Sequence, residues 1–138
     1  WEMAADWYGD ADRVTILIDT NAFLMTSQFN IDLFEELRFL LGSVRMVVPD
    51  IVIRELEGLA RGKGKHAAAA RLGLQFANKC DVIPSSGMGS PDEQIYSSAM
   101  DLQCGVVTND RRLRNLLLKE GLPVVSLAGK QKLELIRR

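Results

Sequence analysis

Short runs of consecutive apolar residues, rich in β-branched side chains, constrain the fold of this chain more than any other feature. The runs lie at residues 14–18, 45–48, 81–83, 105–108 and 123–127. Most of them are apolar without alternation, which is typical of strands covered on both faces. They therefore predict a central parallel sheet of five strands that is buried between helices.

Helical patterns with recognisable ends separate these runs. We expect helices, in chain order, at residues 31–41, from 50 onward, at 66–78, from 91 onward, at 111–119 and at 130–138. Asn30 is the expected N-cap of the first of these helices. Ser90, Pro91 and Glu93 are the N-cap, N1 and N3 residues of a capping box. Strands interleaved with helices predict an α/β fold, a three-layer α/β/α sandwich.

The size of the chain and its charge limit the class of protein. The chain has 138 residues, which suits one domain. Its net charge of −1 excludes a globally basic nucleic-acid-binding surface but not a local basic strip. No run approaches the roughly 18 apolar residues of a membrane span, so we expect no membrane partner. We predict a loosely ordered segment at residues 1–12 and one domain at residues 13–138. The first segment has acidic residues and no apolar block, so it does not resemble a signal peptide.

Cysteine and histidine are too scarce to form a zinc site. The chain has Cys80, Cys104 and a single histidine, His66, and it has no C-x-x-C motif. Two cysteines in a chain of this length without a secretion signal are typical of reduced thiols. We therefore expect a cytoplasmic protein.

Acidic residues recur where the predicted strands end. Asp19 and Asp110 directly follow the first and fourth strands. Glu55 lies one turn into the helix after the second strand, and Asp92 lies in the first turn of the helix that Ser90 caps. Ligands of open α/β sheets bind beyond the carboxyl ends of the strands. These four acidic residues are therefore candidates to meet in one site.

Each acidic residue alone has a simpler structural explanation. Aspartate is a routine N-cap, our preferred interpretation of Asp50, and acidic groups suit the first turn of a helix. A cluster is different, because two carboxylates about 6 Å apart repel by roughly 3 kcal/mol at an effective dielectric near 20. A cluster must therefore take up protons or bind a cation. An all-oxygen ligand set favours Mg²⁺ or Mn²⁺.

Four segments, in order, resemble the motifs of the PIN-domain ribonuclease family. ILIDTNAFL, with Asp19, resembles the first motif, and PDIVIRELEGL, with Glu55, resembles the second. SPDEQIYSSAM, with Asp92, resembles the third, and VVTNDRRLR, with Asp110, resembles the fourth. The resemblance covers residues 14–127. It implies the sheet order 3-2-1-4-5, which separates the two cysteines and argues against a disulfide.

The resemblance implies a metal-dependent endoribonuclease that hydrolyses phosphodiester bonds of single-stranded or loop RNA. The four acidic residues would be catalytic and would hold one or two Mg²⁺ or Mn²⁺ ions. Thr20 and Asn21 would orient Asp19 or a bound water, and Thr108 would hydrogen-bond the carboxylates. Local turn and strand roles are the alternatives for these three supporting residues.

Two basic segments flank the proposed acidic site and are candidates for contacts with an RNA backbone. The candidate residues are Arg54, Arg61, Lys63, Lys65, Arg71, Arg111 and Arg112. A solvated polar surface is the alternative for each of them. No aromatic residues are interleaved with the basic ones, so base stacking is not indicated.

The segment RELEGLARGKG resembles the rRNA-processing and nonsense-mediated-decay branches of the family. We therefore expect a role in RNA processing or decay, with a ribosome-assembly factor or a second copy of the chain as a protein partner. A first alternative is a VapC-type toxin ribonuclease that an antitoxin neutralises. A second is a non-catalytic RNA-binding or scaffold PIN module, against which the presence of all four acidic residues counts.

Overall fold

A six-stranded sheet in the order β3-β2-β1-β4-β5-β6 forms the centre of the protein. The computed structural model describes residues 13–85, 87–129 and 131–137, so the predicted loose segment at 1–12 lies outside the described residues. The strands are β1 (Val14–Ile18), β2 (Val44–Pro49), β3 (Asp81–Ile83), β4 (Gly105–Val107), β5 (Val124–Ala128) and β6 (Lys132–Ile136). The first five strands pair in parallel, which confirms the predicted order 3-2-1-4-5.

The prediction of a helix at 130–138 is wrong, because this part of the chain contains strand β6. Lys132–Ile136 pairs antiparallel with β5 and extends the sheet at that edge. The sequence KLELI alternates between polar and apolar residues at its start, and the structure buries Leu133 but exposes Glu134. A period of two is the signature of a strand with one covered face. Five residues are too few to distinguish it clearly from a helical pattern.

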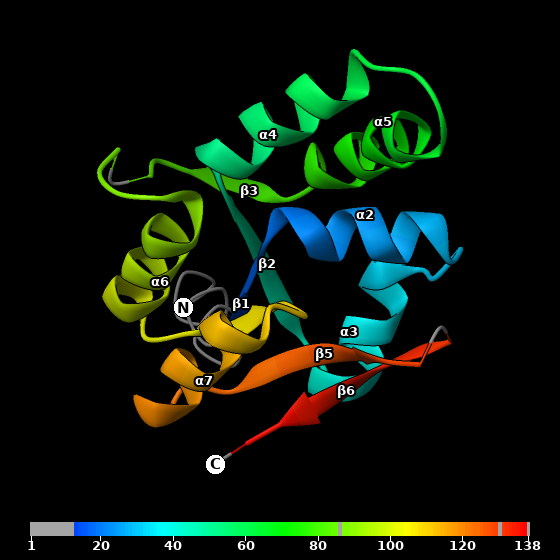
Figure 1. Ribbon diagram of the computed structural model, residues 1–138. Helices are drawn as coiled ribbons and strands as arrows, with labels where there is room; N and C mark the ends of the chain where they lie inside the picture. The colour runs from blue at the N-terminus through cyan, green and yellow to red at the C-terminus, as the bar shows by residue number, and fades with distance from the viewer. Residues whose placement is uncertain (1–12, 86, 130, 138) are drawn as a thin grey trace, which may run out of the picture.

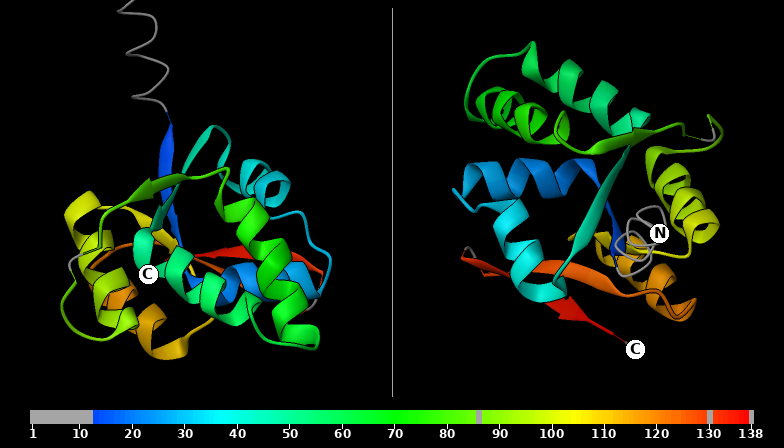
Figure 2. Two further views of the ribbon diagram at one scale, coloured as in Figure 1. Left: turned by 90° about the horizontal axis from the view of Figure 1, so that it is seen from above. Right: turned by 180° about the vertical axis from the view of Figure 1, so that it is seen from behind.

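Helices cover both faces of the sheet, as Figures 1 and 2 show, and this confirms the predicted three-layer architecture. One face carries α2 (Thr20–Gln28), α3 (Leu33–Leu41), α4 (Asp50–Ala60) and α5 (Lys65–Ala77). The other carries α6 (Pro91–Leu102) and α7 (Arg111–Lys119). Right-handed crossovers require this division, because the chain moves outward from β1 to β3 and then from β4 to β5. None of the helices in the described ranges is long and apolar enough to cross a membrane.

Polar caps fix where several helices begin. The predicted capping box is present, since the Ser90 side chain accepts from the Glu93 backbone and the Glu93 side chain accepts from the Ser90 backbone. The prediction that Asn30 caps a helix is wrong. Asn30 lies in the turn between α2 and α3 with φ 58°, and Asp32 caps α3 by accepting from the Glu35 backbone N–H.

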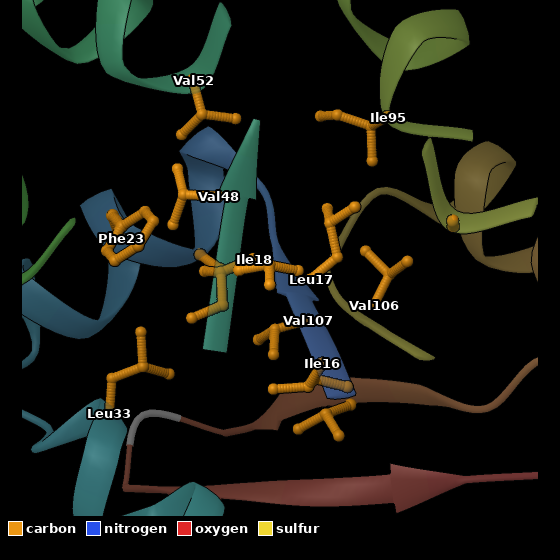
Figure 3. Close-up of a cluster of buried hydrophobic side chains, with 14 of the residues drawn as sticks. Ile16, Leu17, Ile18, Phe23, Leu33, Val48, Val52, Ile95, Val106 and Val107 are labelled. Carbon is orange, nitrogen blue, oxygen red and sulfur yellow. The ribbon is translucent and has the colours of Figure 1, made fainter. Parts of the chain in front are cut away.

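The core consists of the apolar runs that the sequence shows. Ile16, Leu17 and Ile18 of β1 are all at most 1% exposed. Figure 3 shows Phe23 on the side of α2, whereas Ile95 comes from α6 on the opposite side of β1. Both faces of β1 are thus covered, which explains why its sequence lacks alternation.

Both cysteines are free thiols. Cys104, just before β4, is buried, and Cys80, just before β3, is partly buried. Burial raises the pKa of the Cys104 thiol to about 11 and that of the Cys80 thiol to about 12. Neither thiol is therefore a nucleophile at neutral pH.

Gly105 allows β4 to pack closely against its neighbours. A Cβ atom at this position would lie 2.9 Å from the Pro123 carbonyl oxygen and 3.0 Å from Ile16 Cδ1. Gly58 in α4 is different, because a Cβ there would meet no heavy atom within 4 Å. The two glycines therefore give a matched pair of substitutions.

We predict that Gly105→Ala lowers the free energy of unfolding by about 1–3 kcal/mol, because the added methyl group overpacks the sheet. Gly58→Ala should raise it by up to about 1 kcal/mol, because alanine favours the helix. Urea unfolding followed by circular dichroism measures both changes. Destabilisation by both substitutions, or by neither, would contradict the packing described for β4.

Candidate functional site

The four acidic residues predicted from the sequence line one pocket at the carboxyl ends of β1 and β4. Asp19 and Asp110 come from the ends of these strands, Glu55 comes from α4, and Asp92 comes from the first turn of α6. The pocket has a volume of about 260 Å³. Strands β1 and β4 are neighbours whose connections leave in opposite directions, so the pocket lies at the topological switch point of the sheet.

Asp19 is the buried member of this group. Its side chain is 4% exposed, and its Oδ1 accepts from the Ala22 backbone N–H at 2.8 Å, capping α2. Burial raises the pKa of Asp19 to about 7, although hydrogen bonds from Thr108 and Ala22 act in the opposite direction. The negative charges of Asp92 and Asp110 raise this pKa further. A bound cation would stabilise the ionised form of Asp19 at neutral pH.

Glu55 is held in the pocket by Thr20. Thr20 Oγ1 donates to Glu55 Oε1 at 2.7 Å, a contact between α2 and α4. The family resemblance implies that Thr20 orients Asp19 or a bound water, whereas in the structure its hydroxyl group contacts Glu55. Asn21 lines the same pocket.

Thr108 joins the two aspartates at the ends of β1 and β4. It is fully buried, its side chain hydrogen-bonds Asp19, and its Oγ1 accepts from the Asp110 backbone N–H at 3.1 Å. Asp110 Oδ1 in turn accepts from the Leu113 backbone N–H at 2.8 Å and caps α7. These bonds fix both carboxyl groups relative to the sheet.

Asp92 lies at the exposed rim of the pocket. Partial burial of its carboxyl group raises its pKa, and so do the charge of Asp110, a hydrogen bond with Asp110 and the charge of Glu55. The positive charge of Arg112 acts in the opposite direction and lowers this pKa. The negative charges of neighbouring carboxylates thus raise the pKa values of Asp19 and Asp92. Such an interaction is expected of acidic groups that share one site.

The donor chemistry of the pocket fits a hard divalent cation. All four ionisable side chains in it are carboxylates, and Thr20 and Asn21 add further oxygen atoms. The buried Asp19, with its raised pKa, is the group that a cation would stabilise most. Within the described ranges, no three histidine, cysteine, aspartate or glutamate side chains are grouped closely enough to form a ready-made metal site.

Two of the basic candidates lie directly beside the pocket. Arg111 and Arg112 are exposed in the first turn of α7, immediately after Asp110. Arg112 is close enough to Asp92 to lower its pKa.

The other five basic candidates are placed differently. Arg54 lies 3.5 Å from Asp50, and Arg71 donates to the Ala60 carbonyl oxygen at 2.9 Å. The remaining three are exposed around the turn between α4 and α5, and they are Arg61, Lys63 and Lys65. This turn begins six residues after Glu55, about 9 Å farther along the helix axis.

Two positioning contacts were not foreseen from the sequence. The prediction that Asp50 is an N-cap is wrong, because Pro49 is the N-cap of α4 and Asp50 is its first residue. Asp50 Oδ1 instead accepts from the Ser85 backbone N–H at 3.1 Å, and this bond joins the segment after β3 to the start of α4. Asn109 Oδ1 accepts from the Leu127 backbone N–H at 2.7 Å and fixes the β4–α7 connection against β5. Asn109 thus helps to place its neighbour Asp110.

Comparison with known proteins gives a family match, a curated relative and similar solved structures. Residues 16–130 match the family described as PIN like domain. Ribonuclease VapC9 of Archaeoglobus fulgidus is 29% identical over 109 residues, which are 78% of each chain. The solved PIN domain endonuclease Utp24 matches with a TM-score of 0.75 and 29% identity over 92% of this chain and 94% of that chain. VapBC2 of Rickettsia felis, solved with a promoter DNA fragment, shares the fold, with a TM-score of 0.62 and 18% identity over 83% of this chain and 100% of that chain.

We predict that Asp19→Asn stabilises the metal-free protein at pH 8. Asparagine keeps the cap of α2 and removes the buried charge. A pKa raised from 3.8 to about 7 corresponds to a cost of up to about 4 kcal/mol above pH 7. The native state holds this proton between pH 4 and 7 while the unfolded state releases it, so wild-type stability falls as the pH rises through this range.

Thermal unfolding in EDTA between pH 5 and 8 measures this effect. The advantage of the Asp19→Asn variant should shrink toward pH 5. Asp32→Asn is the matched control, because it also preserves an N-cap but at an exposed position. An Asp19→Asn variant that is no more stable than the wild type at pH 8 would contradict the buried-charge interpretation.

Proposed function

Because this chain belongs to the PIN-like domain family, we propose that it is a divalent-metal-dependent endoribonuclease acting on single-stranded or loop RNA. The observation that carries the proposal is that Asp19, Glu55, Asp92 and Asp110 line one pocket at the switch point of the sheet. The ribonuclease and endonuclease names of VapC9 and Utp24 support the same activity.

The residues that would hold Mg²⁺ or Mn²⁺ are the four carboxylates of the pocket. Such an ion, when bound, lowers the pKa of water and stabilises the negative charge that develops on a phosphate during hydrolysis. The protein's own part is to hold the carboxylates in place. Thr108 holds Asp19 and Asp110, and Thr20 holds Glu55.

The same pocket repels a phosphate group unless positive charge lies nearby. Arg111 and Arg112, at the start of α7, supply that charge beside the carboxylates without lining the acidic pocket. They would bind the RNA backbone next to the cleaved bond. The basic turn between α4 and α5 would contact a more distant part of the strand.

For the biological role we propose RNA processing in the cytoplasm, with a ribosome-assembly factor as a protein partner. The segment RELEGLARGKG resembles the rRNA-processing branch, and the likeness to Utp24 spans 92% of this chain. The likeness to VapC9, at the same 29% identity, spans 78% and supports a toxin ribonuclease as the second candidate. Growth arrest of a bacterial host on expression, relieved by a co-expressed antitoxin, would favour the toxin.

We predict that Asp19→Asn, Glu55→Gln, Asp92→Asn and Asp110→Asn each lower the cleavage rate at least about 100-fold. Each substitution removes a negative oxygen ligand, and a bound ion supplies several kcal/mol of charge stabilisation. The assay is cleavage of an end-labelled single-stranded RNA by purified protein in Mn²⁺ or Mg²⁺. Wild-type cleavage by the Asp19→Asn variant would show that the mechanism is wrong, and RNA binding without cleavage in any divalent ion would favour the scaffold alternative.

We predict that Thr20→Val lowers the cleavage rate by roughly 10- to 100-fold, the usual effect of losing a partner that orients a metal ligand. Valine matches threonine in shape but does not donate to Glu55. Thr20→Ser, which keeps the hydroxyl group, should retain most of the activity. A Mn²⁺ titration of both variants separates weaker ion binding from a slower reaction, and equal activity of the two would contradict the role of this hydrogen bond.

A further inference from the structure

A second cavity lies between α6 and α7, beside the acidic pocket. It has a volume of about 120 Å³ and shares Asp92 with that pocket. Tyr96 of α6 and Leu113 and Leu116 of α7 form its apolar wall, and Arg112 lines it as well. Figure 1 shows α6 and α7 as neighbours on the face opposite α4 and α5. An apolar cavity with a few polar groups is typical of a ligand site.

The wall of this cavity is held in place from both helices. The hydroxyl group of Tyr96 hydrogen-bonds Glu120 at the end of α7 and fixes the orientation of the ring. Leu116, on the α7 side of the cavity, is 43% exposed. The Tyr96 ring and the Leu116 side chain thus form an apolar surface that is partly exposed to solvent.

A basic groove continues from the cavity along α7. The residues that line it are Arg111, Arg112, Asn115, Leu116 and Lys119. Arg112 and Leu116 line both the cavity and this groove. The surface therefore passes from the carboxylates to the apolar cavity and then to a cationic groove without interruption.

We propose that the cavity receives one nucleobase of the RNA strand next to the cleaved phosphodiester, with the base stacked on Tyr96 and covered by Leu116. Arg112 and the groove along α7 would bind the phosphates that follow that base. The inference rests on the proposed nuclease function and adds to it a subsite for an unpaired base.

Three features favour a nucleobase over a protein side chain as the ligand. The cavity adjoins the carboxylates through Asp92, so its occupant lies next to the reacting phosphate. Arg111, Arg112 and Lys119 line the groove that adjoins the cavity. Such positive charges are needed to bind the phosphates of an RNA strand. Tyr96 lines the cavity together with Arg112, and an aromatic ring beside cationic residues is the usual platform for single-stranded nucleic acid. A base paired in a duplex is not free to enter such a cavity.

The test is binding of an oligouridine that carries one 2-aminopurine on either side of its central linkage, in EDTA at low salt. Stacking quenches the fluorescence of 2-aminopurine, whereas anisotropy of an end label reports binding alone. Wild-type protein should quench at one of the two positions. Tyr96→Ala should abolish the quenching and weaken binding roughly tenfold, as expected for loss of one stacked base.

Three further variants test the stacking interaction and the cavity wall. Tyr96→Phe keeps the ring and should quench like the wild type, which separates stacking from the hydroxyl group. Leu116→Ala should reduce the quenching, whereas Leu102→Ala, on an exposed leucine of α6 that does not line the cavity, should leave it unchanged. Thermal unfolding verifies that each variant is folded.

The outcomes distinguish this inference from the proposed function. The nucleobase subsite would be overturned if anisotropy shows RNA binding without quenching, or if quenching persists in the Tyr96→Ala variant. A protein partner would then be the favoured ligand of the cavity. Cleavage in Mn²⁺ under those conditions would keep the nuclease proposal intact. RNA that does not bind in EDTA at low salt would overturn the subsite, whereas absence of cleavage in Mn²⁺ or Mg²⁺ would refute the nuclease proposal.

Discussion

Asp19 is a carboxyl group buried where ionisation is unfavourable, because its charge is removed from water. The arrangement of groups around Asp19 follows from this free-energy cost. Asp19 is almost fully buried, and burial raises its pKa to about 7. Hydrogen bonds from Ala22 and Thr108 offset part of the cost. A fold that needed only an N-cap here could use asparagine or serine without this penalty. The aspartate is therefore better explained by a charge that binds to it than by helix capping alone.

The fold was largely predictable because its signals are local. Continuous apolar runs mark strands that are buried on both faces, and β1 and β3 have the predicted bounds. Capping residues mark helix starts, as Ser90 does for α6. The errors arose where the signal is short. Asn30 and Asp32 are both good capping residues two positions apart, and the five residues of β6 fit a strand or the end of a helix from the sequence alone.

The site was predictable only in part, because its contacts join distant segments. The positions after the strands drew attention to Asp19 and Asp110, since parallel strands end at one edge of a sheet. The bond from Thr20 to Glu55 joins residues 35 positions apart and depends on how α2 packs against α4. The cavity beside Tyr96 depends in the same way on the placement of α6 against α7. No aromatic residue is interleaved with the basic segments in the sequence, because Tyr96 comes from α6 and Arg112 comes from α7.

The separation of acidic and basic groups has a physical reason. A guanidinium group inside the pocket would form a permanent ion pair with the carboxylates and compete with any cation for them. At the rim, Arg112 lowers the pKa of Asp92, whereas burial is the largest cause of the raised pKa of Asp19. Under the proposed function, Asp19 thus stays available to bind a cation, while the positive charge along α7 attracts the RNA backbone. The proposed function requires attraction for both a metal ion and a phosphodiester, and the carboxylates of the pocket and the arginines at the start of α7 supply these two attractions separately.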